Sequence, residues 1–252
     1  MIIDTHCHIQ FKPLNKDVEG VMRRANDAGV YKFIVVGCDL TTSEQAIEIA
    51  KKYHNTFAAV GIHPHDAGTI TDPIWQKVEE LAKEREVIAI GETGLDYFRN
   101  LSPKEEQISG FVRHINLALK LDLPLIVHNR DADEDSLRIL QEHNVEKAVF
   151  HCFSSNVEFA RKVWMAGYMT SFTGNITYPK AHDLHRVVEE CPLDAMMVET
   201  DCPYMAPQKF RGATNEPAFV VEVVREIANL KGKKFNEIVE VTSKNADEFF
   251  KI

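Results

Sequence analysis

The sequence has no long hydrophobic run and no cleavable apolar leader. No apolar stretch approaches the roughly 18 residues that a membrane-spanning helix needs. The given sequence starts with Met1 followed by Ile2-Ile3-Asp4, and its first residues show no basic segment ahead of an apolar one. We therefore expect a protein that makes no membrane contact and works in the cytoplasm.

Cysteine is scarce, and its spacing shows no paired motif. The 5 cysteines are irregularly spaced, and no two form a C-x-x-C pair. This argues against a disulfide framework and indicates free thiols in a reducing compartment. Cys7, Cys152 and Cys202 each stand beside a candidate site residue, and we interpret them as small buried packing residues.

Positive charge is in deficit, with 29 Lys and Arg against 38 Asp and Glu and a formal net charge of −9. This balance excludes an extended basic surface of the kind that follows a nucleic-acid backbone. A polyanionic substrate must then be held locally, by metal cations and one or two basic side chains. Nothing in the sequence indicates an obligate protein partner.

The chain does contain a regular alternation of short apolar runs and longer amphipathic segments. The runs are nearly continuous, as is typical of strands covered on both faces. They lie at residues 2–3, 33–36, 57–60, 87–90, 125–127, 148–150, 168–172 and 195–198. Eight such units match a (β/α)₈ barrel in number and size. The alternative, an open doubly wound sheet, lacks its G-x-G-x-x-G turn. We predict an α/β protein, a single-domain TIM barrel over residues 1–252.

Helix-boundary signals separate the apolar runs. The S/T-x-x-E capping box occurs at Thr41 with Glu44, Ser102 with Glu105, and Ser155 with Glu158. Asp72 before Pro73 fits an N-cap followed by proline, and Gly29 and Gly167 fall where helices should end. Two extra helices, near residues 219–230 and 236–250, are expected to close the chain.

Histidines and acids follow these runs at their carboxyl ends. They are His6, His8, His63, Glu92, His128, His151, Glu199 and Asp201. In a (β/α)₈ barrel these strand ends share one rim, and that rim holds the active site. The amino ends of the strands carry no comparable set of histidines. The sequence therefore predicts that distant residues converge on one site.

Imidazole and carboxylate groups together suit a first-row divalent cation. Six of these groups are too many for one tetrahedral centre, and they suit two ions that share a bridging carboxylate. Such a pair lowers the pKa of a bound water and clamps the attacking and leaving oxygens, which indicates hydrolysis. We interpret His54, His114, His143, His182 and His185 as surface or packing residues, and we leave His65 open.

Seven motifs are specific enough to indicate a family. They are Thr5-His6-Cys7-His8, Gly61-Ile62-His63-Pro64, Gly91-Glu92-Thr93-Gly94-Leu95-Asp96-Tyr97, Ile126-Val127-His128-Asn129-Arg130, His151-Cys152-Phe153-Ser154, Glu199-Thr200-Asp201-Cys202-Pro203-Tyr204, and Arg211-Gly212 with Asn215-Glu216-Pro217. In order, spacing and identity this set resembles the TatD family of metal-dependent deoxyribonucleases, within the amidohydrolase superfamily. The resemblance runs from Asp4 to about Pro217.

The resemblance implies a cofactor of two divalent metal ions, with Mg, Mn or Zn as candidates. It implies these ligands: His6, His8 and Asp201 for one ion, His128 and His151 for the other, and Glu92 as the bridge. Asp201 would also orient the bridging hydroxide that attacks phosphorus and would take its proton. His63 and Arg130 would contact the phosphate, whose oxygens match the planar fork of arginine.

Three other acidic positions have less definite roles. Glu199 could orient a ligating histidine or be the buried partner of a lysine, and Asp96 and the pair Asn215-Glu216 are expected to shape loops. The sequence departs from the usual family pattern at Thr93, Phe98 and Ser155-Asn156. None of these positions is a proposed ligand, so the departures bear on substrate preference rather than on the chemistry.

The candidate ligands indicate a metal-dependent hydrolase, and the resemblance to the TatD family implies a deoxyribonuclease that acts on single-stranded DNA as a 3′–5′ exonuclease. An alternative keeps the metal site and changes the bond, giving an acyl or amide hydrolase such as a D-aminoacyl-tRNA deacylase, since the site alone does not decide. A non-enzymatic barrel stabilised by metal is a third interpretation. Ligands at an open rim argue against it, because structural metal sites are normally closed.

Overall fold

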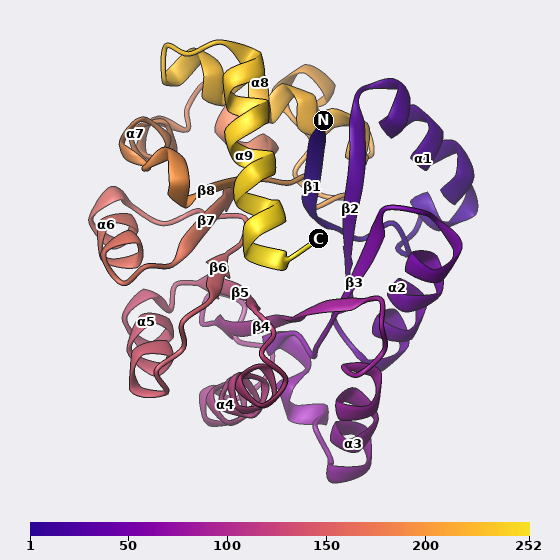
Figure 1. Ribbon diagram of the computed structural model, residues 1–252. Coiled ribbons are helices and arrows are strands. Elements are labelled where there is room, and N and C mark those ends of the chain that lie inside the picture. Colours follow the sequence, from indigo (N-terminus) through magenta and orange to yellow (C-terminus); the bar gives the residue numbers. More distant parts are fainter.

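The computed structural model describes residues 1–252, which form a barrel of eight parallel strands surrounded by helices (Figure 1). The strands are β1 Ile2–Cys7, β2 Val30–Val36, β3 Thr56–Val60, β4 Val87–Asp96, β5 Leu125–Arg130, β6 Ala148–Phe150, β7 Met169–Phe172 and β8 Met196–Val198. They pair in sequence order. Every apolar run in the sequence is a strand, so the predicted fold class is confirmed.

The last strand returns beside the first. The Thr5 hydroxyl donates a hydrogen bond to the carbonyl of Val198 at 3.1 Å, and the amide of Asp201 donates to the carbonyl of His6 at 2.9 Å. These bonds bring the carboxyl ends of β1 and β8 together. The amino-terminal and carboxyl-terminal parts of the rim therefore form one site.

Helices cover the outer face of the barrel. They are α1 Val18–Asp27, α2 Leu40–Lys52, α3 Asp72–Leu81, α4 Lys104–Leu121, α5 Asp133–Glu142, α6 Val157–Met165, α7 His182–Glu190, α8 Val220–Leu230 and α9 Phe235–Phe250. The two closing helices predicted from the sequence are α8 and α9. No helix combines the length and the apolar character that crossing a membrane requires.

Two predicted helix caps are wrong by one or two residues. Asp39, rather than Thr41, caps α2: its carboxylate accepts the Thr42 amide at 2.7 Å, and the Thr42 hydroxyl completes the reciprocal box. Asn156, rather than Ser155, caps α6. In both cases a second side chain able to cap lies close by, so residue type alone does not choose between them.

The remaining boundary signals had mixed outcomes. Ser102 does not cap α4, because its hydroxyl instead accepts the Gly68 amide at 3.0 Å. Asp72 is the first residue of α3 rather than its cap. Gly29 and Gly167 do follow helix ends, with φ of 90° and 83°, values that glycine adopts without strain.

The helix α9 closes the amino-terminal end of the barrel, across which it lies in Figure 1. Its Ala246 and Phe250 pack against residues that line the interior of the barrel: Ile3, Ile34, Val36, Ala59, Ala89, Ile126, Val149 and Met197. The Asn245 amide group donates to the carbonyl of Met196 at 2.8 Å, at the start of β8. With this end plugged, only the carboxyl-terminal rim is open to a ligand.

Candidate metal centre

The carboxyl ends of the strands surround one cavity of about 710 Å³. Its walls include most of the site residues predicted from the sequence: His8, His63, Glu92, His128, Arg130, His151 and Asp201. His6 lies beneath the cavity, fully buried, and Glu199 is buried behind His151. The barrel therefore brings all of the predicted rim residues together.

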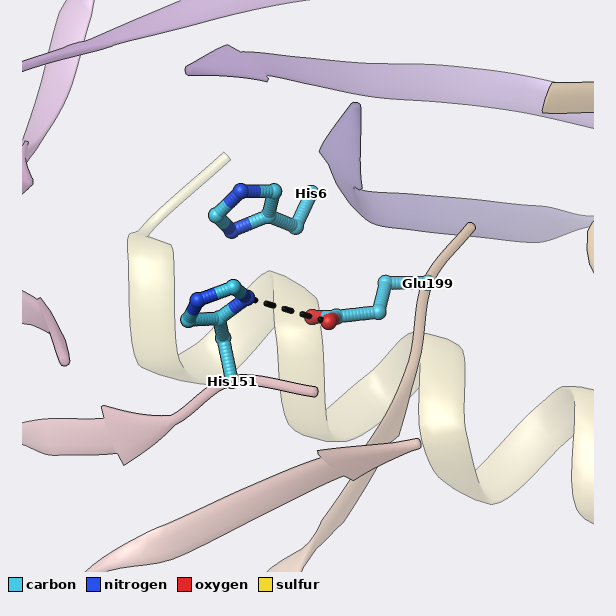
Figure 2. Close-up of side chains that lie close together, drawn as sticks. All are labelled: His6, His151 and Glu199. Carbon is cyan, nitrogen blue, oxygen red and sulfur yellow. Dashed lines mark hydrogen bonds and ion pairs between the residues drawn. The ribbon is translucent and has the colours of Figure 1, made fainter. Parts of the chain in front are cut away.

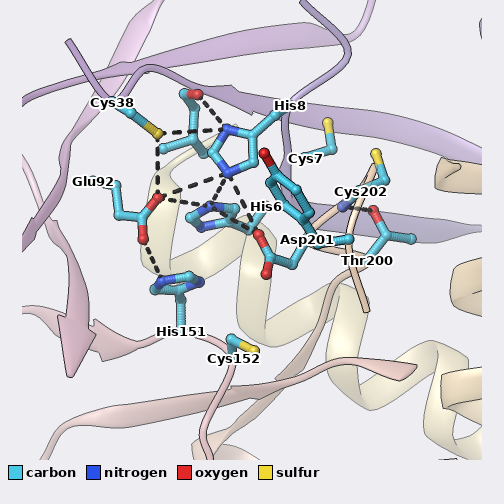
Figure 3. Close-up of polar contacts among 12 residues, drawn as sticks. His6, Cys7, His8, Cys38, Glu92, His151, Cys152, Thr200, Asp201 and Cys202 are labelled. Carbon is cyan, nitrogen blue, oxygen red and sulfur yellow. Dashed lines mark hydrogen bonds and ion pairs between the residues drawn. The ribbon is translucent and has the colours of Figure 1, made fainter. Parts of the chain in front are cut away.

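Glu92 contacts histidines on both sides of its carboxylate, and Figure 3 shows its contacts with His6, His8 and His151. Its Oε1 is 2.8 Å from His151 Nε2 and 2.9 Å from His128 Nδ1. Its Oε2 is 3.5 Å from His6 Nε2 and 3.7 Å from His8 Nε2. One carboxylate oxygen thus faces each pair of imidazoles, which is the arrangement of a carboxylate that bridges two cations.

His6, on β1, and His8, directly after it, present ring nitrogens on one side of Glu92. His8 Nδ1 lies 2.7 Å from the carbonyl of Val36. A carbonyl only accepts, so Nδ1 carries the proton and the lone pair of the neutral ring is on Nε2. This Nε2 faces His6 Nε2 at 3.1 Å and Asp201 Oδ1 at 3.4 Å. Lone pairs and carboxylates that converge in a buried space fit a divalent cation.

His151 lies on the other side of Glu92. Figure 2 shows that its ring is held by Glu199. Its Nδ1 lies 3.3 Å from Glu199 Oε1, so the proton of the neutral ring points at Glu199 and Nε2 points at Glu92. Glu199 also accepts the Cys152 amide at 2.7 Å and the Ser171 hydroxyl. Glu199 pairs with no lysine. Of the two interpretations considered from the sequence, the one in which it orients a histidine fits these contacts.

His128 is held in the same way by Asp96. Its Nε2 lies 3.2 Å from Asp96 Oδ2, while Nδ1 faces Glu92. Asp96 also accepts from His65 Nε2 at 2.7 Å and from the Arg99 amide at 2.7 Å. Burial by itself raises the pKa of Asp96, but the hydrogen bonds from these partners outweigh it and hold the pKa below its usual range.

The roles of Asp96 and His65 were missed from the sequence. Asp96 was expected only to shape a loop, and His65 was left open. A signal was available, since Asp96 follows Glu92 by four residues and even spacing on a strand places side chains on one face. His65 carries no such signal, because it lies in a 3₁₀ helix, Pro64–Thr69, after β3.

His63 is oriented in the opposite sense to these rings. Its Nδ1 accepts the His65 amide at 3.1 Å, so the proton of the neutral ring is on Nε2, 3.3 Å from Glu92 Oε1. Burial lowers the pKa of His63 to about 4, which keeps the ring neutral near pH 7. A nitrogen that carries a proton donates a hydrogen bond and does not bind a cation. His63 is therefore a donor at the cavity wall.

Arg130 lines the cavity without an acidic partner. It forms no ion pair with the adjacent Asp131, and its guanidinium carbon lies 3.9 Å from the centre of the Phe98 ring. Its hydrogen-bond donors are therefore available to an anion in the cavity.

All five cysteines are free, as the sequence predicts. Cys7 and Cys202 are buried packing residues, but Cys152 is half-buried and lines the cavity, so its predicted packing role is wrong. Cys38, which was not singled out from the sequence, also lines the cavity, with Sγ 3.5 Å from Glu92 Oε2. It follows β2 by two residues. Like the histidines, it therefore lies at the carboxyl end of a strand, where the cavity is.

Comparison with known proteins agrees with this geometry. The family described as "TatD related DNase" matches residues 3–251. The metal-dependent hydrolase YabD of Bacillus subtilis (strain 168) is 40% identical over 254 residues, covering all of both chains. The protein named "3'-5' ssDNA/RNA exonuclease TatD" of Shigella flexneri serotype 5b (strain 8401) is 32% identical and covers 94% of each chain.

A solved structure gives the same result. The TatD homologue YjjV of Escherichia coli K12 superimposes with a TM-score of 0.95 and 31% sequence identity, covering 100% of this chain and 98% of that one. A match over the whole length, together with the barrel and its donor set, establishes the family. The chain belongs to the TatD family of metal-dependent hydrolases.

Proposed function

We propose that this single-domain protein hydrolyses phosphodiester bonds of DNA and removes nucleotides from the 3′ ends of single strands. The observation that carries the proposal is the position of Glu92, with one carboxylate oxygen facing each of two histidine pairs. The Shigella relative, which is named as a single-strand exonuclease, supports the choice of substrate. The five free thiols are in keeping with a cytoplasmic place of action.

The proposed ligand assignment is the one that the family resemblance implies, and the ring nitrogens that face Glu92 support it. His6, His8 and Asp201 would hold one divalent ion, His128 and His151 the other, and Glu92 would bridge them. Mg, Mn and Zn are the candidates. When bound, the two ions would supply a nucleophilic water near neutral pH and positive charge for the transition state.

The side chains around these ligands have separate tasks in the proposed reaction. Asp201, with 15% of its side chain exposed, is open to the cavity and would take the proton of the attacking water. The His63 Nε2–H and the Arg130 guanidinium would donate hydrogen bonds to phosphate oxygens, whose negative charge increases in the transition state. Unpaired arginines in the cavity wall favour a phosphate over the neutral ester or amide of an acyl substrate.

A gel time course tests the proposed function. Metal-stripped protein would be incubated with 5′-labelled single-stranded DNA, and Mg, Mn or Zn would be added back, with Glu92→Ala as the control. We expect a ladder that shortens from the 3′ end and depends on both the metal and Glu92. No cleavage with any metal, combined with hydrolysis of an acyl ester, would reject the proposal in favour of an acyl hydrolase.

A further inference from the structure

Charge is distributed unevenly around the rim of the cavity. Asp39 and Asp66, which follow β2 and β3, lie on one wall, and Arg99 and Arg130, at the ends of β4 and β5, lie on another. Near β1 and β8 the wall also carries the large side chains Phe11, Tyr204 and Met205. A polyanionic chain that has one phosphate at the centre of the cavity is therefore attracted toward the wall formed by β4 and β5 and repelled from the acidic wall.

The segment Phe98-Arg99 follows β4 and lies beside that wall. Arg99 is exposed, lines the cavity and forms no ion pair, while its backbone amide is fixed on Asp96 Oδ1 at 2.7 Å. Phe98 is 60% exposed, an unusual position for a phenyl ring, and Arg130 lies against it. An anchored arginine beside an exposed aromatic ring is the combination that binds single-stranded nucleic acid.

We propose that Phe98 and Arg99 form a strand-binding subsite beside the metal centre. Arg99 binds a phosphate that neighbours the scissile one, and Phe98 stacks on a base of the same strand. The inference rests on the proposed function and extends it, because it makes a strand, rather than an isolated phosphodiester, the preferred substrate. Arg130 links the two regions, since it lines the cavity and contacts the Phe98 ring.

The experiment compares two substrates in the metal-loaded protein. One is a single DNA strand of about a dozen nucleotides, and the other is bis(4-nitrophenyl) phosphate, which has one phosphate and no neighbouring nucleotide. We expect Arg99→Gln and Phe98→Leu each to lower kcat/KM for the strand about ten-fold, mainly through KM. The loss on the small diester should be at least several-fold smaller.

Matched controls lie at the opposite end of the barrel. Arg85, an exposed arginine without an ion pair, precedes β4, and Tyr31, an aromatic residue that is 43% exposed, lies near the start of β2. Arg85→Gln and Tyr31→Leu should leave kcat/KM for both substrates unchanged.

The salt dependence of the reaction provides a second measurement. Arg99→Gln should reduce the slope of log(kcat/KM) for the strand against log salt by about 0.7, the value for one phosphate contact on a single strand.

The possible outcomes separate this inference from the proposed function. Equal losses on both substrates, or no loss on the strand, would overturn the subsite while leaving the nuclease intact. A wild-type protein that cleaves the small diester but no DNA strand would overturn the proposed function and the subsite together. A loss confined to the strand, absent from Arg85→Gln and Tyr31→Leu, is the result that the subsite requires.

Discussion

The position of one proton distinguishes otherwise similar histidines in this cavity. His8, His128 and His151 each direct one ring nitrogen at an acceptor outside the cluster, which leaves the other nitrogen free to bind a cation. His63 accepts a backbone amide instead, so its inner nitrogen carries hydrogen. His63 lies close enough to Glu92 and His128 to form a metal-binding group with them. Its hydrogen bond from the His65 amide argues against a ligand role, because the nitrogen that faces Glu92 then carries a proton.

This distinction predicts different losses for two variants. We expect His63→Ala to lower kcat on single-stranded DNA about 10²- to 10³-fold while the protein keeps its bound metal, because a donor to the transition state is removed. Glu199→Gln should instead weaken metal binding about 10- to 100-fold, because His151 loses its orienting carboxylate. Mass spectrometry of metal per chain after dialysis, measured alongside kcat, checks both. Loss of a metal from His63→Ala would contradict the assignment.

At the scale of elements, α4 is attached to the loop that carries His63. His114 on α4 accepts the Ile62 amide at Nε2, at 2.9 Å, and its Nδ1 donates to the carbonyl of Gly110 at 2.7 Å. The ring is fully buried, which lowers the pKa of His114 to about 4. This histidine was predicted to be a packing residue, and its contacts confirm that. It also fixes the strand end that leads to His63.

Because the His114 ring is buried and has a lowered pKa, we expect the stability of the protein to depend on pH. Between pH 6.5 and 4 the unfolded chain protonates His114 and the native protein does not, so stability falls as the pH falls through this window. The loss attributable to His114 from pH 6.5 to pH 5 is about 1.5 kcal/mol. Urea unfolding of metal-free protein at the two pH values, for wild type and His114→Gln, measures it.

In His114→Gln the loss of stability between these pH values should be smaller by about that amount. NMR of the wild-type imidazole provides an independent check, since the ring should remain neutral at pH 5. A ring that is protonated at pH 5, or an equal pH dependence in the two proteins, would contradict the prediction.

At the scale of the whole molecule, α9 joins the two ends of the chain at the closed end of the barrel. The Ser243 hydroxyl donates to the carbonyl of Met1 at 2.5 Å, and Asn245 donates to the carbonyls of Leu193 and Met196. Phe250, 3% exposed, packs against the interior of the barrel. The contacts of α9 that stabilise the barrel and the open rim with the candidate site therefore lie at opposite ends of the fold.

This separation predicts a variant that loses stability but not activity. Phe250→Ala should lower the free energy of unfolding by about 3–5 kcal/mol, because it leaves a cavity in the plug. Met165→Ala, at an 89% exposed position, should change it by less than about 0.5 kcal/mol. Urea unfolding gives these values. At a temperature where both variants are folded, kcat should equal that of the wild type, and a specific loss in Phe250→Ala would contradict the separation.

Local pattern was enough to predict the barrel and the identity of the rim residues. The run Phe33–Val36 is apolar whatever it packs against, and a strand covered on both faces requires such a run. His128 and Glu199 directly follow runs of this kind, so strand order alone places them on one rim. The helix caps were predicted less well, because Asp39 and Thr41 are both able to cap and lie two residues apart.

Sequence pattern was therefore enough for the fold class, the family and most of the groups around the cavity. Which ring nitrogen of each histidine carries the proton depends instead on contacts made in the folded protein. The proton of His8 is placed by Val36, that of His128 by Asp96 and that of His151 by Glu199, all partners far away in the chain. Hydrophobic periodicity is a local property, whereas a ring's tautomer depends on the acceptor that packing brings to it.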